Sequence, residues 1–384
     1  MNMSTRQQAF TVQYRMTSQC NAHCAYCLNA FNRGERMSEA DFQHSIRFLI
    51  EQYLPTLIST STPIELEYVG GEISVLPFDQ FQRCVDYARG QFRAAGYRYQ
   101  DGCQSNFVGN PLVLKKIWAL FKGNVTTTVD SFSDQRQLFG SADRYRSRFS
   151  RNIAQVCSQS QTHAPKGVVF VIDKKTIEFA QEEALIAMKK GYSIGLYPAY
   201  QAVNPVEMVD PETLGDVLIA IADKWILQSN TPIEPLAHLL RMVVTNDVQW
   251  AGKGDSCPFC HQCATRSICV ETNGDLYVCM DLSQTKHYRI GNALTNSFDL
   301  DVIRTLNQRP IRLSTNCRNC RFVQFCKGGC LNHALQNGMD INSPAYFCKT
   351  WKKLLTHFEE VIQSQGAYRV ATWLSQQEKA KFYC

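Results

Sequence analysis

The sequence predicts an α/β protein, in which a partial barrel of six β/α units is followed by a small cysteine-rich domain. Two observations support this prediction. Short β-rich runs alternate with amphipathic helical stretches from about residue 11 to residue 200, and ten of the 17 cysteines lie between Cys257 and Cys348. A length of 384 residues with 45% apolar residues is enough for one large barrel and an appendage.

The barrel prediction comes from the order of the elements. Ser38 and Asp41 form a capping box before the first helix, and Asn110-Pro111 begins the third. Consecutive β/α units form parallel sheets with right-handed crossovers, and six of them curl into a partial barrel. The expected strands span residues 12–16, 64–69, 97–99 (a weak strand reaching toward 106), 125–129, 168–172 and 193–197; the expected helices span residues 42–53, 78–92, 111–121, 149–156 and 176–190.

Further elements are expected after the barrel. The chain predicts helices at residues 210–228 and 235–244, a hairpin of residues 267–271 and 275–279 around Asn273-Gly274, and a closing helix at residues 351–363. The rise in cysteine density marks the main boundary. We expect the barrel in residues 1–205, a helical bridge in 206–255, the cysteine-rich domain in 256–350 and a C-terminal helix and tail in 351–384.

Composition excludes several function classes. The chain has 40 Lys and Arg residues and 34 Asp and Glu residues, which gives a net charge of +6, and it has no dense basic run. Neither nucleic acid nor an anionic membrane is therefore an expected partner. The chain has no apolar run of membrane-spanning length, and its polar first ten residues do not resemble a signal peptide. We therefore expect a cytoplasmic protein, in which closely spaced cysteines bind metal rather than form disulfides.

Three cysteines follow the first strand in the pattern C-x3-C-x2-C, namely Cys20, Cys24 and Cys27. Three thiolates on one loop can hold a 4Fe-4S cluster by three of its four irons, which leaves the fourth iron open to a small-molecule chelate. Zinc is the alternative, but a structural zinc site needs four ligands and His23 is poorly placed between the cysteines.

This motif resembles that of the radical S-adenosylmethionine (SAM) superfamily. The resemblance implies that the open iron binds the amino and carboxylate groups of SAM, and that the reduced cluster cleaves SAM to a 5′-deoxyadenosyl radical. Other segments resemble the SAM-contacting motifs of the superfamily, with Ile73 in place of the usual proline after the GGE motif. The implied SAM-binding residues are Tyr26 against the adenine, Gly70, Gly71 and Glu72 in the GGE motif, Gln104, Ser105 and Asn106, and Asp130 and Ser131.

The later cysteines are similar to those of the SPASM extension, which carries two auxiliary 4Fe-4S clusters. The resemblance assigns one cluster to Cys317, Cys320, Cys326 and Cys348. It assigns the other to Cys263, Cys279, Cys330 and a fourth ligand, for which Cys257 is preferred over Cys260. The alternative for this region is a pair of zinc ribbons. The other cysteines are expected to have packing or structural roles: Cys84, Cys103, Cys157, Cys269 and Cys384.

Enzymes of this architecture mostly modify peptides or proteins. The resemblance therefore implies a peptide or protein substrate, SAM and three 4Fe-4S clusters as cofactors, and an external electron donor such as flavodoxin or ferredoxin. Asp281 is a candidate catalytic base; a solvated aspartate at the hairpin exit is the alternative.

The preferred reaction is an oxidative crosslink in a ribosomally made peptide, either a cyclophane-type C–C bond or a thioether. Only nineteen residues precede Cys20, so no N-terminal leader-binding domain is expected. Formylglycine formation in sulfatases is an alternative, although Met280 rather than Asp follows Cys279, and Asp130-Ser131-Phe132 replaces a DGP motif. The remaining alternatives are dehydrogenation of a small alcohol and a non-enzymatic zinc-ribbon scaffold.

Overall fold

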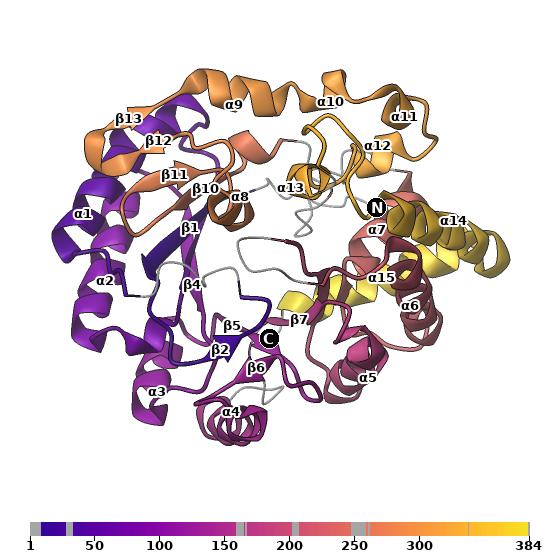
Figure 1. The fold of residues 1–384 in the computed structure, drawn as a ribbon, viewed down its shortest axis with the longest axis horizontal. Helices are drawn as coiled ribbons and strands as arrows, with labels where there is room; N and C mark the ends of the chain where they lie inside the picture. Colours follow the sequence, from indigo (N-terminus) through magenta and orange to yellow (C-terminus); the bar gives the residue numbers. More distant parts are fainter. Residues whose placement is uncertain are drawn as a thin grey trace.

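The computed structural model describes residues 9–27, 34–158, 165, 167–201, 207–246, 259, 262–336 and 338–382. It confirms the α/β class. Six parallel strands lie side by side in chain order, and helices surround them (Figure 1). These strands are β1 (Phe10–Thr17), β3 (Ile64–Gly70), β4 (Tyr99–Gln104), β5 (Val125–Val129), β7 (Gly167–Ile172) and β8 (Ile194–Pro198).

Each crossover between these strands carries a helix. As predicted, Ser38 caps the first helix by accepting a hydrogen bond from the Asp41 N–H, and Asn110 caps the third. The fourth helix begins earlier than its apolar spacing predicts, because Ser141 caps it. The five helices are α1 (Glu39–Phe48, continued by a π-helical turn at Leu49–Tyr53), α2 (Phe78–Ala94), α3 (Pro111–Leu120), α4 (Ala142–Val156) and α5 (Ala180–Lys190, preceded by a 3₁₀ turn at Ile177–Phe179).

The sheet continues beyond the six strands, which the sequence did not indicate. β9 (Ile233–Glu234) extends it beside β8. At the opposite edge, β10 (Ser267–Val270) pairs in parallel with β1, with Val12 opposite Ile268. β11 (Asp275–Tyr277), β12 (Gly291–Asn292) and β13 (Ser297–Phe298) complete the order. The predicted hairpin is confirmed: β10 and β11 are antiparallel, and Gly274 takes a positive φ of 83° in the turn.

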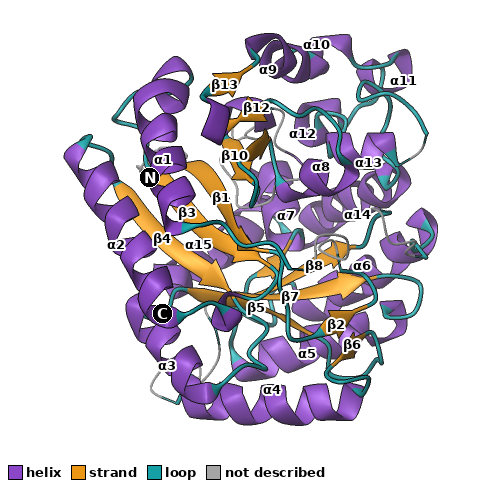
Figure 2. Ribbon diagram, turned by 60° about the vertical axis from the view of Figure 1, so that its left-hand side comes forward, coloured by secondary structure: helices purple, strands orange, loops and turns teal. Residues whose placement is uncertain are grey.

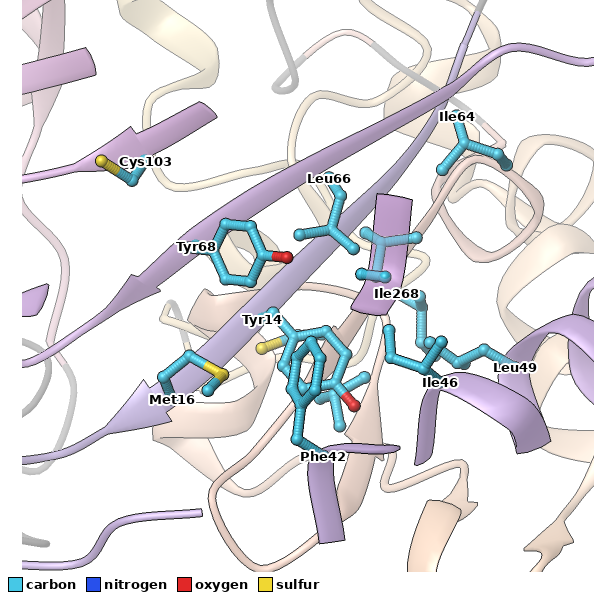
Figure 3. Packing of buried hydrophobic residues seen from close by; sticks show 14 of the residues in the cluster. Tyr14, Met16, Phe42, Ile46, Leu49, Ile64, Leu66, Tyr68, Cys103 and Ile268 are labelled. Atoms are coloured by element: carbon cyan, nitrogen blue, oxygen red, sulfur yellow. The ribbon is translucent and has the colours of Figure 1, made fainter. Parts of the chain in front are cut away.

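The hairpin is part of the barrel core rather than an attachment to it. Figure 3 shows Ile268 of β10 among Tyr14 of β1, Leu66 of β3 and Ile46 of α1. All four are fully buried. The cysteine-rich region is thereby fixed at the β1 edge of the barrel.

Helices after the barrel form a second packed group. α6 (Pro211–Trp225) and α7 (Leu236–Thr245) confirm the two helices expected there, and α14 (Cys348–Gln365) packs against both (Figure 2). α14 is longer than the predicted closing helix, and α15 (Ala367–Phe382) was not predicted; Trp373 of α15 contacts Trp225 edge-on. No described helix has the length and apolar character needed to cross a membrane.

Short helices carry the cysteine-rich segment between the hairpin and α14. They are α8 (Met280–Thr285), α9 (Leu300–Asn307), α10 (Arg309–Arg312), α11 (Thr315–Arg318), α12 (Val323–Cys326) and α13 (Leu331–Leu335).

Candidate functional site

The three-cysteine loop leaves β1 at Thr17 and is held by two neighbours. Its short strand β2 (His23–Cys24) pairs with β6 (Arg136–Gln137), so that Cys24 lies opposite Arg136. On the other side it contacts the two glycines at the end of β3. A Cβ added at Gly70 would lie 2.3 Å from the Thr17 carbonyl oxygen, and one at Gly71 would lie 2.0 Å from that of Gln19. The glycines therefore allow close backbone approach, here to the cysteine loop itself.

Glu72 of the GGE motif is hydrogen-bonded to the Gln104-Ser105-Asn106 segment. Its side chain is 1% exposed. Oε1 accepts hydrogen bonds from the Ser105 hydroxyl (2.8 Å) and the Ser74 N–H (3.0 Å), and Oε2 accepts one from the Asn106 N–H (2.6 Å). A carboxylate offers about four lone-pair sites. Oε2 therefore keeps the capacity to accept one further donor.

Asn106 connects this network to the first cysteine. Its side-chain Nδ2 lies 3.7 Å from Cys20 Sγ and donates a hydrogen bond to Asn21 Oδ1 at 2.8 Å. The backbone carbonyl oxygen of Asn106 accepts a hydrogen bond from the Tyr145 hydroxyl at 3.1 Å. The end of β4 is thus fixed against the cysteine loop.

Tyr26 of this loop and Arg136 of β6 lie close together. Tyr26 is buried; burial raises the pKa of its hydroxyl, and the nearby Arg136 cation opposes this effect. The Arg136 side chain is 6% exposed, stacks 4.8 Å from the centroid of the Tyr145 ring, and has an Nε without a hydrogen-bond partner in the described structure. Sequence reasoning missed Arg136, because no motif marks a buried arginine on a two-residue strand.

A cavity of about 1230 Å³ is lined by residues of both the barrel and the cysteine-rich region. The three cysteines of the loop line it with Tyr26, Glu72 and Arg136. Cys279, Asp281 and Cys330 of the cysteine-rich region line it as well. Gly70, Gly71, Gln104, Ser105 and Asn106 also contribute to its wall.

The cavity wall does not include Asp130 and Ser131. Asp130 is buried and accepts from the N–H and hydroxyl of Ser133, while the Ser131 N–H donates to Glu183 at 2.6 Å. These bonds shape the turn after β5. A contact of either residue with SAM stays a prediction.

The three thiols suit a shared cationic partner. Burial raises the pKa of Cys20 to about 12, and Glu72, Cys24 and Cys27 act in the same direction. Burial also raises the pKa of Cys24, which the Arg136 cation opposes. Desolvated thiols that repel one another as thiolates need a metal to hold them ionised. Among the described residues, no three His, Cys, Asp or Glu side chains converge on a single ion; in a 4Fe-4S cluster, each thiolate binds a different iron.

Four of the later cysteines, which the resemblance assigns to one cluster, line one small pocket. Cys317, Cys320, Cys326 and Cys348 line a pocket of about 40 Å³ together with Phe322 and Trp351. The pKa of Cys326 is raised to about 11, mainly by burial, and Cys348, Cys320 and Cys317 act in the same direction. Cys348 is the first residue of the 18-residue helix α14, where the helix dipole favours a thiolate.

The second predicted ligand set is described in part. Cys279 precedes α8 and Cys330 precedes α13, and both face the large cavity. Cys263 lies half-buried at the 3₁₀ turn before β10. Cys257 and Cys260 lie outside the described residues, as does Cys384, so the fourth ligand stays open.

Two residues that sequence reasoning missed line the same cavity as Asp281. They are Tyr200, after β8, and the buried His333 of α13, whose rings are 5.9 Å apart. Burial lowers the pKa of His333 to about 4. Neither residue has a motif around it, because the fold brings it to the cavity from a distant segment.

Four cysteines expected to pack do so. Cys84, Cys103, Cys157 and Cys269 are all buried. Cys269 lies in β10, with its Sγ 3.7 Å from Glu271 Oε1.

No protein-family model matches the sequence. Among solved structures, the chain is similar to the sulfatase-maturating enzyme anSMEcpe with bound AdoMet, at a TM-score of 0.75 and 14% identity over 98% of this chain and 99% of that one. For the same enzyme with bound AdoMet and Cp18Cys peptide, the TM-score is 0.72 and the identity is 15%, over 92% of this chain and 98% of that one. For Streptococcus suis SuiB bound to precursor peptide SuiA, the TM-score is 0.61 and the identity is 13%, over 89% of this chain and 76% of that one. The chain therefore has the fold of radical SAM enzymes of the SPASM type, as its cysteine motifs predicted.

Proposed function

We propose that this protein is a radical SAM enzyme with two auxiliary clusters that oxidatively modifies a peptide. The observation that supports this most directly is that the three-cysteine loop lines the same cavity as Cys279 and Cys330. A cofactor on the loop and an electron acceptor at the far cysteines would face the same substrate.

The thiol groups would hold three 4Fe-4S clusters. Cys20, Cys24 and Cys27 would bind the first, and the four cysteines of the small pocket the second. Cys263, Cys279 and Cys330, with Cys257 or Cys260, would bind the third. When reduced and bound to SAM, the first cluster supplies a 5′-deoxyadenosyl radical that abstracts hydrogen from the substrate.

The chain's own polar groups fit the amino acid part of SAM. Glu72 Oε2 has room for one more donor, which suits the ammonium group. Arg136 is a buried guanidinium on the cavity wall without an ion pair in the described structure, which suits the carboxylate. The buried ring of Tyr26 suits the adenine.

We favour an oxidative crosslink in a ribosomally made peptide, with flavodoxin or ferredoxin as electron donor in the cytoplasm. SuiB, bound to its precursor peptide, has this fold. A second candidate is oxidation of a Ser or Cys side chain, as expected for sulfatase maturation. Two observations favour it: Asp281 lines the cavity although it stands one residue later than expected, and nearly the whole length of anSMEcpe matches this chain. In either reaction Asp281 is our candidate to accept the substrate proton.

The first test is the metal content of anaerobically reconstituted protein, beside a Cys20/Cys24/Cys27→Ala variant. We expect about twelve irons per chain in the unmutated protein and about eight in the variant. Only the unmutated protein should form 5′-deoxyadenosine from SAM. Stoichiometric zinc with almost no iron in both would reject the enzyme and favour a scaffold.

The second test separates the candidate reactions. Reconstituted enzyme is incubated with SAM and either a precursor peptide encoded near the gene or a sulfatase peptide that carries Cys or Ser. Loss of two hydrogens with a new crosslink in tandem mass spectra supports the first candidate. Formylglycine supports the second, and oxidation of a polyol alone would contradict both.

A further inference from the structure

Arg309 is a buried cation in the cysteine-rich region with an unusual set of partners. It is 4% exposed at the start of the short helix α10. All of its hydrogen bonds go to backbone carbonyl oxygens. Nη1 donates to Lys327 O (3.1 Å) and Gly329 O (2.8 Å), Nη2 donates to Gly328 O (2.9 Å), and Nε donates to Ile341 O.

Three of these carbonyls belong to consecutive residues that join two cysteines. Lys327, Gly328 and Gly329 form the whole link between Cys326 and Cys330. All three have positive φ, at 51°, 83° and 71°. A Cβ at Gly328 would lie 2.5 Å from Leu313 and 3.1 Å from the Arg309 Nη2. The link is therefore wrapped around the guanidinium, and a side chain at Gly328 would disturb this arrangement.

The same link separates the two proposed auxiliary clusters. Cys326 lines the small four-cysteine pocket, together with Gly328 and Gly329. Cys330 faces the large cavity instead, with Cys279. The peptide N–H of Gly328 hydrogen-bonds Cys326 and acts to lower the pKa of that thiol, while the carbonyl oxygen of the same peptide group, which is that of Lys327, accepts from Arg309 Nη1. The amide thus has its positive end at the sulfur and its negative end at the cation.

Thiols of both ligand sets lie within electrostatic range of the guanidinium. Burial lowers the pKa of Arg309, while Cys330 and Cys263 from one set and Cys317 and Cys326 from the other act to raise it. A cation between two anionic clusters favours the reduced form of each, because reduction adds one negative charge.

We propose that Arg309 is a positioning residue shared by both auxiliary clusters, which fixes the link between their ligands and, through its charge, raises both reduction potentials. This inference rests on the proposed function only in requiring that both clusters bind. Uptake of one electron by each cluster, supplied by dithionite in a redox titration, is the reaction affected.

The test compares Arg309→Lys, which keeps the charge, with Arg309→Gln, which removes it. Arg312→Gln is the matched control, because Arg312 lies exposed on the same short helix. Iron and sulfide content and circular dichroism are measured first. The potentials of the auxiliary clusters then come from titrations followed by electron paramagnetic resonance, with the Cys20/Cys24/Cys27→Ala protein used to identify their signals.

We expect R309K and R312Q to resemble the unmutated protein. In R309Q the ratio of reduced to oxidised auxiliary clusters should fall about tenfold at a given solution potential, which is a shift of about 59 mV for one electron. Loss of auxiliary iron in R309Q but not in R309K also supports the proposal. Equal iron content together with equal potentials in R309K and R309Q would overturn it. An unmutated protein without iron would instead reject the proposed function.

Discussion

Arg15 of β1 forms a buried ion pair with Glu271, which follows β10. Arg15 Nε lies 3.0 Å from Glu271 Oε2, and the two side chains are 2% and 4% exposed. The pair joins the first barrel strand to the hairpin of the cysteine-rich region. It therefore reinforces the backbone pairing of β1 with β10 at the edge of the large cavity.

Removal of one partner of this pair should destabilise the protein strongly. Glu271→Ala leaves a desolvated guanidinium without its carboxylate, and we expect a loss of about 3–5 kcal/mol in the free energy of unfolding. Denaturant unfolding of the metal-free protein measures it. The double variant R15M/E271L should lose less than E271A alone, because no buried charge remains. Arg304→Gln, in the exposed pair with Asp301, should change stability by less than about 1 kcal/mol. Equal effects of E271A and R304Q would contradict the buried-pair interpretation.

A second prediction concerns Glu72. Glu72→Gln replaces one acceptor oxygen with an NH₂ group, which must then face the N–H of Asn106 or the donors Ser74 and Ser105. The mismatch should cost about 1–3 kcal/mol and displace the end of β4. We expect SAM binding, measured by equilibrium dialysis on reconstituted protein, to weaken at least tenfold. Ser105→Ala removes one donor and leaves the carboxylate, so it should weaken binding much less. Unchanged affinity in E72Q would exclude a role of the carboxylate in holding the cofactor.

The parts of the site that the sequence predicted are those with a local pattern. Cys20, Cys24 and Cys27 have fixed short spacings, and Asn273-Gly274 is a strong turn signal. The missed parts depend on long-range contacts. Arg309 binds backbone carbonyls, which every residue type provides, and Arg15 meets a partner 256 positions away. The parallel pairing of β1 with β10 likewise has no local signal, because the residues of a strand do not specify which strand lies beside it.

A third prediction concerns acid stability of the hairpin. Burial raises the pKa of Asp275, but hydrogen bonds from Arg289, Asn292 and Asn273 outweigh it, so the pKa is lowered overall. A carboxyl with a lowered folded pKa stabilises the protein above its unfolded pKa of about 3.9, and this stabilisation disappears as pH falls through the folded value. Asp275→Asn should therefore be less stable than the unmutated protein at pH 6, and the difference should shrink below about pH 4. Urea unfolding across this range measures it; a difference that is constant with pH would contradict the assignment.

The last prediction uses the contact between the GGE motif and the cysteine loop. A Cβ at Gly71 would lie 2.0 Å from the Gln19 carbonyl oxygen and 2.5 Å from its carbon, and backbone atoms cannot move away as a flexible side chain can. Gly71→Ala must therefore displace the loop that presents Cys20. We expect reconstituted iron to fall from about twelve to about eight per chain, since only the first cluster depends on this loop. Gly90→Ala is the matched control, because Gly90 lies within α2 with no atom within 4 Å of the added Cβ. It should keep all of its iron and gain roughly 0.5–1 kcal/mol of stability from the better helix former. Full iron in G71A would show that the loop can bind its cluster without this close contact, whereas the loss of four irons in G71A alone would assign the contact to the first cluster.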